Sequence, residues 1–174
     1  MTTRPRLKLS RTDVITRFRD IKLLSLDVDG ILTDGGIYYL DDGQQIRKFN
    51  SKDGMGIKEV VKAGIAMCWV TASNTPSIRH RAEALGVPHI LINVEDKLTA
   101  MMALLAELGI ELSEVAHMGD DINDLPLLES VGCPLTAADA VFEAKDAAVY
   151  ITERVGGDAA VREICDLLVA SRRP

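Results

Sequence analysis

The chain has 174 residues, of which 47% are hydrophobic and 26% are charged, and its formal net charge at pH 7 is −6. This length suits one domain with a sizeable core, whereas the negative charge and the 4% aromatic content argue against a nucleic-acid partner. No apolar run reaches the roughly 20 residues that span a bilayer, so we expect no membrane contact and, by default, a cytoplasmic location.

The N-terminal segment, residues 1–12, is predicted to be a flexible arm because its first residues are basic or polar and lack apolar anchors. No apolar segment follows these basic residues, so we do not expect this segment to be a secretory signal. Residues 13–174 are expected to form a single domain, with a hairpin at 35–51 and a C-terminal helix and tail at 153–174. Three scattered cysteines are predicted to be buried, reduced thiols.

Apolar runs of strand length alternate with helical patterns along this domain. The sequence predicts strands at 21–28, in both arms of a hairpin around Asp42-Gly43, and at 65–73, 89–93, 114–121 and 147–152. It predicts helices at 53–64, 76–86, 96–109, 122–132 and 159–171. This alternation favours right-handed crossovers and an α/β fold, a three-layer α/β/α sandwich with a Rossmann-like parallel sheet.

Polar side chains gather where the predicted strands end. The residues concerned are Asp27 and Asp29, Thr71 and Ser73, and Asp120 and Asp121. Ligands of such sheets bind beyond the carboxyl ends of the strands, so these side chains are expected to converge there. Crowded carboxylates repel one another unless a cation is present, and hard oxygen ligands suit Mg²⁺. Lys97, at the start of a helix, could meet a substrate phosphate at the same rim.

Each aspartate taken alone has a simpler explanation, because an aspartate in such a turn often only caps the next helix. The ordered combination is more specific. D-x-D-G, a strand-end threonine, a downstream lysine and G-D-D-x-x-D follow one another in this order. We therefore interpret the set as a catalytic site.

Four stretches of the chain, "LDVDGILTDG", "VTAS", "DK" and "GDDIND", resemble the four motifs of the haloacid dehalogenase-like phosphatase superfamily. Two further stretches, "DGGIYYLDDGQQIRKFNSKDGMGI" and "GGDAAVREICDLL", resemble its 3-deoxy-D-manno-octulosonate 8-phosphate phosphatases. The related phosphatase-like domain of acylneuraminate cytidylyltransferases is similar in layout. The resemblance covers roughly residues 14 to 170.

The resemblance implies roles for two catalytic aspartates. Asp27 would be the nucleophile that forms an aspartyl-phosphate, and Asp29 would be the general acid and then the general base. Mg²⁺ would be held by the Asp27 carboxylate, the Asp29 main-chain carbonyl and Asp120. These three residues form the expected metal site.

The resemblance also implies a phosphate-binding set, which comprises Thr71, Ala72 and Lys97. Asp121 and Asp124 would orient the metal site and Lys97 without ligating the metal directly. The three histidines, His80, His89 and His117, share no metal-ligand spacing and are interpreted as structural.

The intervals between the motifs leave no room for the cap domain that many superfamily members carry. The resemblance implies a homotetramer in which a neighbouring subunit closes each active site and excludes water. For the apolar hairpin residues 37–40 we favour a subunit interface over a place in the core.

Substrate-binding positions follow from the resemblance less directly. They are Asp29 and Ser73 at the strand ends, Asn50, Ser51, Lys52, Asp53 and Gly54 after the hairpin, and Lys58, Arg81 and Arg162. The alternative for each of the cations Lys58 and Arg81 is a solvated charge on a helix surface. Two positions depart from the family: the second motif reads Thr-Ala-Ser instead of Thr-Gly-Arg or Thr-Gly-Glu, and Ala159 replaces an expected glycine.

The leading hypothesis is a Mg²⁺-dependent phosphatase for an eight- or nine-carbon 2-keto-3-deoxy sugar acid, a small phosphorylated substrate. Ser73 leaves the sugar itself open. One alternative is a non-catalytic tetramerisation module, and another is a phosphatase of a different small metabolite.

Overall fold

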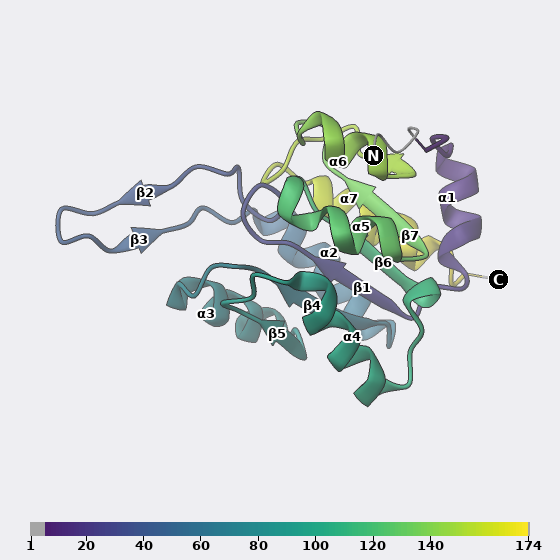
Figure 1. Cartoon of the computed structure of the whole chain (residues 1–174), viewed down its shortest axis with the longest axis horizontal. Coiled ribbons are helices and arrows are strands. Elements are labelled where there is room, and N and C mark those ends of the chain that lie inside the picture. Colours follow the sequence, from purple (N-terminus) through teal and green to yellow (C-terminus); the bar gives the residue numbers. More distant parts are fainter. Residues whose placement is uncertain (1–5, 174) are drawn as a thin grey trace.

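The computed structural model describes residues 6–173, and within them one parallel sheet forms the centre of the molecule (Figure 1). Its strands are β1 (Leu23–Leu26), β4 (Ala66–Val70), β5 (His89–Leu91), β6 (Val115–Met118), β7 (Cys133–Thr136) and β8 (Tyr150–Ile151). The helices are α1 (Arg11–Phe18), α2 (Ser51–Lys62), α3 (Pro76–Leu85), α4 (Lys97–Leu108), α5 (Leu125–Ser130), α6 (Phe142–Ala147) and α7 (Ala160–Ala170). Short 3-10 turns lie at η1 (Leu112–Glu114) and η2 (Ile122–Asp124).

The strand order of the sheet is β5-β4-β1-β6-β7-β8, and all pairs are parallel. The chain first builds outward from β1 to β4 and β5, then returns to the other side of β1 with β6. This reversal places the carboxyl ends of β1, β4 and β6 next to one another, which is where open α/β sheets bind ligands. In register, Leu23 of β1 pairs with Ala66 of β4 and with Val115 of β6.

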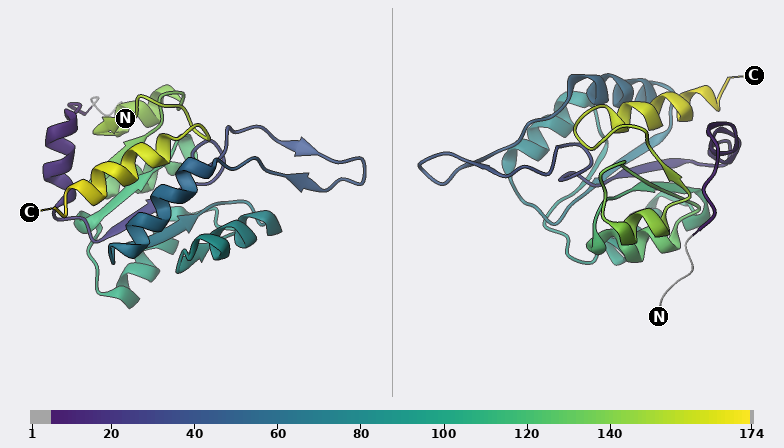
Figure 2. Two further views of the ribbon diagram at one scale, coloured as in Figure 1. Left: turned by 180° about the vertical axis from the view of Figure 1, so that it is seen from behind. Right: turned by 90° about the horizontal axis from the view of Figure 1, so that it is seen from above.

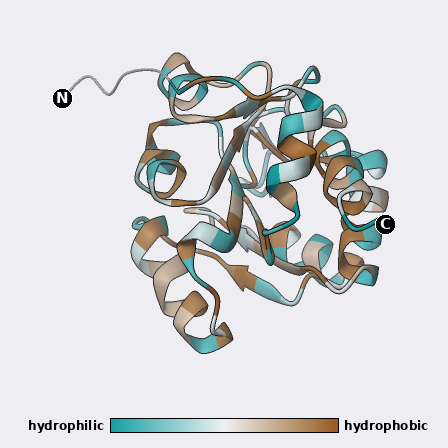
Figure 3. Cartoon of the chain, turned by 90° about the vertical axis from the view of Figure 1, so that its right-hand side faces the viewer, coloured by the Kyte–Doolittle hydropathy of each residue, from teal (hydrophilic) through white to brown (hydrophobic). Residues whose placement is uncertain are grey.

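Two helix layers cover the sheet and confirm the predicted sandwich. Figure 2 shows α2 and α7 packed side by side on one face, with α5 and α6 on the other. All four residues of β1 are buried, as a strand covered on both faces requires. Figure 3 shows the hydrophobic colour concentrated on the strands and the inner helix faces, with hydrophilic residues outside. Burial on both faces explains why three of the four residues of β1 are leucines.

The predicted hairpin is confirmed as a separate two-stranded sheet of β2 (Tyr38–Tyr39) and β3 (Gln45–Ile46), which projects from the body (Figure 1). At its tip Gly43 has a φ of +83°, and the Asp42 side chain accepts a hydrogen bond from the Gln44 backbone. Phe49 returns the chain to the body, where its ring stacks with Trp69 at 6.2 Å. Large apolar side chains on the hairpin are exposed, namely Ile37, Tyr38, Tyr39, Leu40 and Ile46.

Strand β7 and helix α6 were not predicted from the sequence. Pro134 lies inside β7, and a proline usually argues against an inner strand because it cannot donate a hydrogen bond. In β7 the Pro134 carbonyl still accepts from Val149, and the residue pairs in register with His117. The missing N–H donor of Pro134 is tolerated because β7 still pairs with β6 on one side and with β8 on the other.

The segment expected to be a flexible arm, residues 1–12, lies partly outside the described residues. From residue 6 onward it contacts the domain: the Leu9 backbone donates to Val149, and Lys8 Nζ donates to the Ala148 carbonyl at 2.6 Å. Helix α1 begins at Arg11, where Ser10 and Asp13 form a capping box.

No described helix combines the length and the apolar character needed to cross a membrane. The three cysteines, Cys68, Cys133 and Cys165, are all buried and unbridged. Burial raises the pKa of the Cys68 and Cys133 thiols to about 12 and also raises that of Cys165, so they stay protonated at neutral pH.

Candidate active site

The end of β1 fixes the first aspartate rigidly. The Asp27 backbone donates a hydrogen bond to Met118 of β6 at 2.9 Å, and the side chain is almost fully buried. Gly30 follows with a φ of +87°, and a Cβ atom built there would overlap the Asp120 carboxylate. Only glycine therefore lets this turn pass close to the end of β6.

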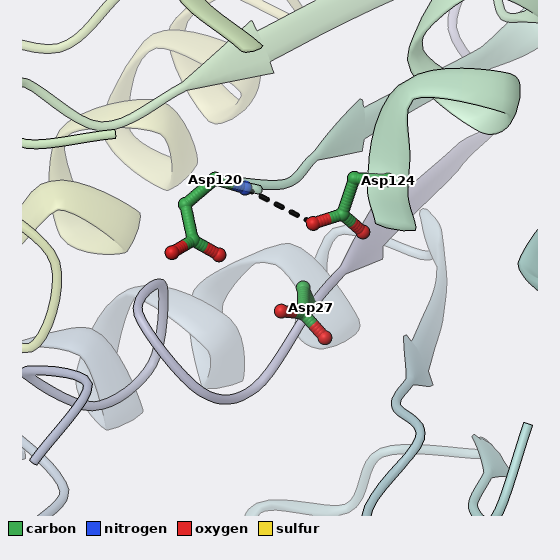
Figure 4. A group of neighbouring side chains, drawn as sticks. All are labelled: Asp27, Asp120 and Asp124. Carbon is green, nitrogen blue, oxygen red and sulfur yellow. Dashed lines mark hydrogen bonds between the residues drawn. The ribbon is translucent and has the colours of Figure 1, made fainter. Parts of the chain in front are cut away.

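Three carboxylates meet at the sheet edge. Figure 4 shows Asp27, Asp120 and Asp124 facing a common space, and one oxygen from each lies within 4.8 Å of the others. Desolvation, followed by the charge of Asp124, raises the pKa of Asp27 well above its ordinary value. Desolvation and the charges of Asp124 and Asp121 raise the pKa of Asp120 to about 7. Both shifts follow from burying like charges close together, an arrangement that a bound cation would stabilise.

Asp124 has a different environment, because both of its oxygens already accept hydrogen bonds. Oδ1 accepts from Lys97 at 2.6 Å and contacts His117 Nε2 at 3.3 Å, and Oδ2 accepts from the Asp120 backbone at 3.1 Å. Burial by itself raises the pKa of Asp124, but the hydrogen bonds from His117 and Lys97 and the charge of Lys97 oppose it, and the pKa is lowered. Asp124 thus orients its neighbours and has little capacity left for a metal.

His117 is buried in β6 and joins this network at its inner end, so its structural role includes contact with the site. Its Nδ1 lies 3.0 Å from Ser25 Oγ, in register across β1 and β6. Desolvation lowers the pKa of His117, which favours the neutral ring. A neutral ring with its proton on Nε2 can donate to Asp124 while Nδ1 accepts from Ser25.

Lys97, the first residue of α4, supplies the positive charge. Asp96 caps this helix by accepting from the Thr99 backbone, which points the Lys97 side chain into the site. Lys97 Nζ lies 2.7 Å from Asp27 Oδ1, and the residue is 2% exposed. Desolvation would lower its pKa, but the charges of Asp27 and Asp124 outweigh it and raise the pKa. Lys97 therefore remains a cation inside the protein.

The residues present fit a divalent metal ion. Asp120 Oδ1 is buried and has no hydrogen-bond partner among the described residues, and Lys97 occupies only one oxygen of Asp27. An unpaired buried carboxylate oxygen is unfavourable without a cation, and Mg²⁺ commonly takes one or two carboxylates while keeping waters. Asp27 and Asp120 are the side chains suited to hold it.

A pocket of about 180 Å³ opens in front of this cluster. It is lined by Asp27, Asp29, Thr71, Ala72, Ser73, Asp120, Asp121 and Asn123. Thr71 Oγ1 accepts from the Ser73 backbone at 3.1 Å, so its hydroxyl proton stays available for a ligand. Asp121 is exposed and caps η2, and among the described residues the side-chain partners of Lys97 are Asp27 and Asp124. Larger hollows of 770 and 530 Å³ lie elsewhere on the surface and contain none of these residues.

Most of the predicted substrate-binding residues lie outside this pocket within the chain. Asn50 caps α2, and Asp53 is buried with Oδ1 accepting from the Arg162 backbone at the start of α7. These contacts give both residues a structural task. Gly54 packs close to Arg81. Ser51 and Lys58 are exposed, and Lys52 and Arg162 line the 530 Å³ hollow.

Sequence reasoning missed Arg47, which follows β3. Its Nε and Nη2 donate to the two oxygens of Asp29 at 2.7 and 2.9 Å, and Nη2 also donates to Ser73 at 2.9 Å. Arg47 lies within the stretch 34–57 that resembles the family, but it was not singled out there. One feature of the sequence could have pointed to Arg47, because the second strand of the predicted hairpin leads back toward the predicted site.

We expect Mg²⁺ to stabilise the protein more at pH 8 than at pH 5. In the metal-free protein the raised pKa of Asp120 contributes stability that is fully present below the unfolded value of 3.8 and is lost as the pH rises through about 7. At pH 8 the ion meets a free carboxylate, whereas at pH 5 it must displace a proton. Thermal unfolding in Mg²⁺ and in a chelator measures the stabilisation by Mg²⁺ at each pH. In Asp120→Asn this stabilisation should no longer depend on pH. Equal shifts at both pH values would contradict the assignment.

Comparison with known proteins agrees with this geometry. The haloacid dehalogenase-like hydrolase family matches residues 90–164. The 3-deoxy-D-manno-octulosonate 8-phosphate phosphatase of Escherichia coli strain K12 is 39% identical over 160 residues, which are 92% of this chain and 85% of that protein.

Two solved structures are also similar. The Moraxella catarrhalis 3-deoxy-D-manno-octulosonate 8-phosphate phosphatase, in complex with magnesium, phosphate and KDO, has a TM-score of 0.89 and 36% identity, covering 92% of each chain. The cobalt-bound Haemophilus influenzae phosphatase has a TM-score of 0.86 and 32% identity, covering 90% of this chain and 91% of that one.

The chain is therefore a haloacid dehalogenase-like hydrolase. Within that class it belongs to the family of 3-deoxy-D-manno-octulosonate 8-phosphate phosphatases, which confirms the resemblance drawn from its motifs.

Proposed function

We propose that the chain is a Mg²⁺-dependent phosphatase that hydrolyses the phosphate ester of a 2-keto-3-deoxy sugar acid. The substrate is 3-deoxy-D-manno-octulosonate 8-phosphate or a nine-carbon ulosonate 9-phosphate. The observation that carries the proposal is the buried pairing of Asp27 and Lys97 beside the unpaired Asp120 oxygen, in a pocket that also contains Asp29. The relatives named above support the substrate class.

In the proposed reaction a carboxylate oxygen of Asp27 attacks phosphorus and forms an aspartyl-phosphate. The bond from phosphorus to the sugar oxygen breaks, and that oxygen takes a proton from Asp29. Asp29, now ionised, accepts a proton from a water molecule whose oxygen attacks the aspartyl-phosphate. Phosphate leaves and Asp27 is regenerated. Mg²⁺, held by Asp27 and Asp120 with the Asp29 carbonyl, would supply charge neutralisation for the phosphoryl oxygens.

Lys97 and Thr71 complete the proposed phosphate site. A lysine ammonium has three N–H donors, and two of those of Lys97 are used by Asp27 and Asp124. The third can bind a phosphoryl oxygen, together with the Thr71 hydroxyl and the backbone at Ala72. Charge on the equatorial oxygens in the transition state is thereby neutralised.

A homotetramer in the cytoplasm is part of this proposal. The pocket is open, so water exclusion needs a further element, and the exposed apolar side chains of the hairpin suit a subunit interface. Three buried free thiols fit a reducing compartment. A monomeric molar mass in static light scattering would contradict the assembly.

Phosphate release tests the function. We expect turnover of an eight- or nine-carbon ketodeoxy sugar phosphate with Mg²⁺, no turnover in a chelator, and recovery when Mg²⁺ is added back. A comparison of the two sugar phosphates by kcat/KM would identify the better substrate. Failure to hydrolyse either sugar phosphate, with turnover of another phosphate ester, would reject the substrate class. Failure with every ester would favour the alternative hypothesis, a non-catalytic tetramerisation module.

A further inference from the structure

Arg47 links the hairpin to the active site. It is the residue that follows β3, and its side chain crosses to Asp29 and Ser73, which both line the pocket. A second link runs beside it, since Ser73 Oγ lies 3.0 Å from Thr75 Oγ1, which donates to Gln45 of β3 at 3.4 Å. The returning hairpin strand is thus bonded to the loop after β4.

The Arg47 guanidinium is buried, and one of its nitrogen atoms has no hydrogen-bond partner in the described part of the chain to offset the loss of water. The Arg47 side chain is 7% exposed, against 40% for Asp29, and Nη1 is buried without a hydrogen-bond partner among the described residues. A buried donor without a partner destabilises the fold, and an apolar residue could anchor the hairpin without that penalty. Anchoring the hairpin therefore does not account for an arginine at this position.

The geometry of the contact accounts for it better. Nε and Nη2 form a planar fork that holds both Asp29 oxygens, so the plane of the carboxylate is fixed. An ionised carboxylate has about four acceptor positions, and the fork occupies two of them. The remaining positions can serve a water or a leaving-group oxygen in the pocket.

Charge gives a second argument. The aspartates that line the pocket are Asp27, Asp29, Asp120 and Asp121. Among the described residues, Lys97 and Arg47 are the cations that bond to them, one on Asp27 and one on Asp29. Once Asp29 has given its proton to the leaving oxygen, it is ionised beside the phosphoryl group, and the charge of Arg47 offsets the resulting repulsion.

We propose that Arg47 is a positioning residue of this enzyme: it fixes the carboxylate of Asp29 for proton transfer and makes the hairpin part of the catalytic machinery. The inference rests on the acid and base role proposed for Asp29. If Arg47 positions Asp29, the loss of activity without Arg47 should depend on the leaving group of the substrate. A basic leaving oxygen needs a proton from Asp29, whereas a weakly basic one does not.

The test compares phenyl phosphate with p-nitrophenyl phosphate, which have similar size but leaving groups of different basicity. We expect Arg47→Ala to lower kcat/KM, which reports the step that releases the leaving group, by about 100-fold for phenyl phosphate and by about 10-fold for p-nitrophenyl phosphate, with KM little changed. Arg47→Lys should recover part of the loss, and added guanidinium ions should partly rescue Arg47→Ala. Lys48→Ala is the matched control, because Lys48 is the neighbouring hairpin cation and pairs with Asp34 outside the pocket.

Equal losses of kcat/KM for the two esters would overturn the proposal, because a structural defect does not distinguish leaving groups. A raised KM with unchanged kcat would also overturn it and would make Arg47 a substrate contact. Thermal unfolding of each variant separates a folding defect from both outcomes. These esters contain no sugar, so the result stands even where the sugar acid phosphates fail as substrates.

Discussion

Asp27→Asn is expected to abolish phosphatase activity, with kcat lowered by at least about 10⁴-fold. An amide oxygen is too weak a nucleophile to form the phosphorylated intermediate, and the variant also loses one carboxylate ligand of the metal. The fold should tolerate the change. Asparagine keeps an oxygen for Lys97 and removes a charge that Asp120 and Asp124 repel. We therefore expect the free energy of unfolding to fall by no more than about 1 kcal/mol.

Asp34→Asn provides the matched control for this substitution. Asp34 lies in the same stretch of sequence, but its carboxylate bonds to Gly36, Tyr38 and Lys48 on the hairpin side. Its kcat should stay within about threefold of the parent enzyme, since surface substitutions away from the site have small effects. Steady-state phosphate release gives both values. More than a tenth of the parent activity in Asp27→Asn would exclude Asp27 as the nucleophile.

Lys97→Met is expected to destroy activity and also to destabilise the protein. Lys97 is the buried cation between Asp27 and Asp124, whose side chains are 8% and 0% exposed. Removing one partner of a buried ionic network leaves unpaired charge, which costs about 3–5 kcal/mol. The phosphoryl group also loses a cation, so kcat should fall by about 10³-fold or more.

The stability loss in Lys97→Met should depend on pH. The raised pKa of Asp27 means that the folded protein takes up its proton more readily than the unfolded chain, so the protonated form stabilises the fold at low pH. Chemical denaturation at acidic and neutral pH should show the larger deficit at neutral pH. Lys62→Met, at the exposed end of α2, is the control and should change stability by less than about 0.5 kcal/mol. A Lys97→Met protein as stable as the parent would refute the ionic network.

The sequence alone was sufficient for the central part of the site. Strands and helices alternate, so the sheet is parallel, and residues that follow its strands must gather at one edge. This reasoning brought Asp27, Asp120 and Thr71 together from positions far apart in the chain, and the structure contains that cluster. It worked because the alternation of strands with helices makes the strands parallel, and parallel strands end at the same edge of the sheet.

Only the tertiary structure decided the side-chain contacts between elements that are far apart in the chain. Arg47 reaches Asp29 because the chain returns to the end of β1 after β3, and no local pattern encodes that return. Asp53 was predicted to bind substrate because it matches the family motif. In the structure its side chain accepts a hydrogen bond from the Arg162 backbone at the start of α7, 109 residues further along the chain. Register between β1 and β6 sets His117 against Ser25. Periodicity in a sequence reports which face of an element is buried, but ion pairs and caps form between elements, so their partners exist only once the chain has packed.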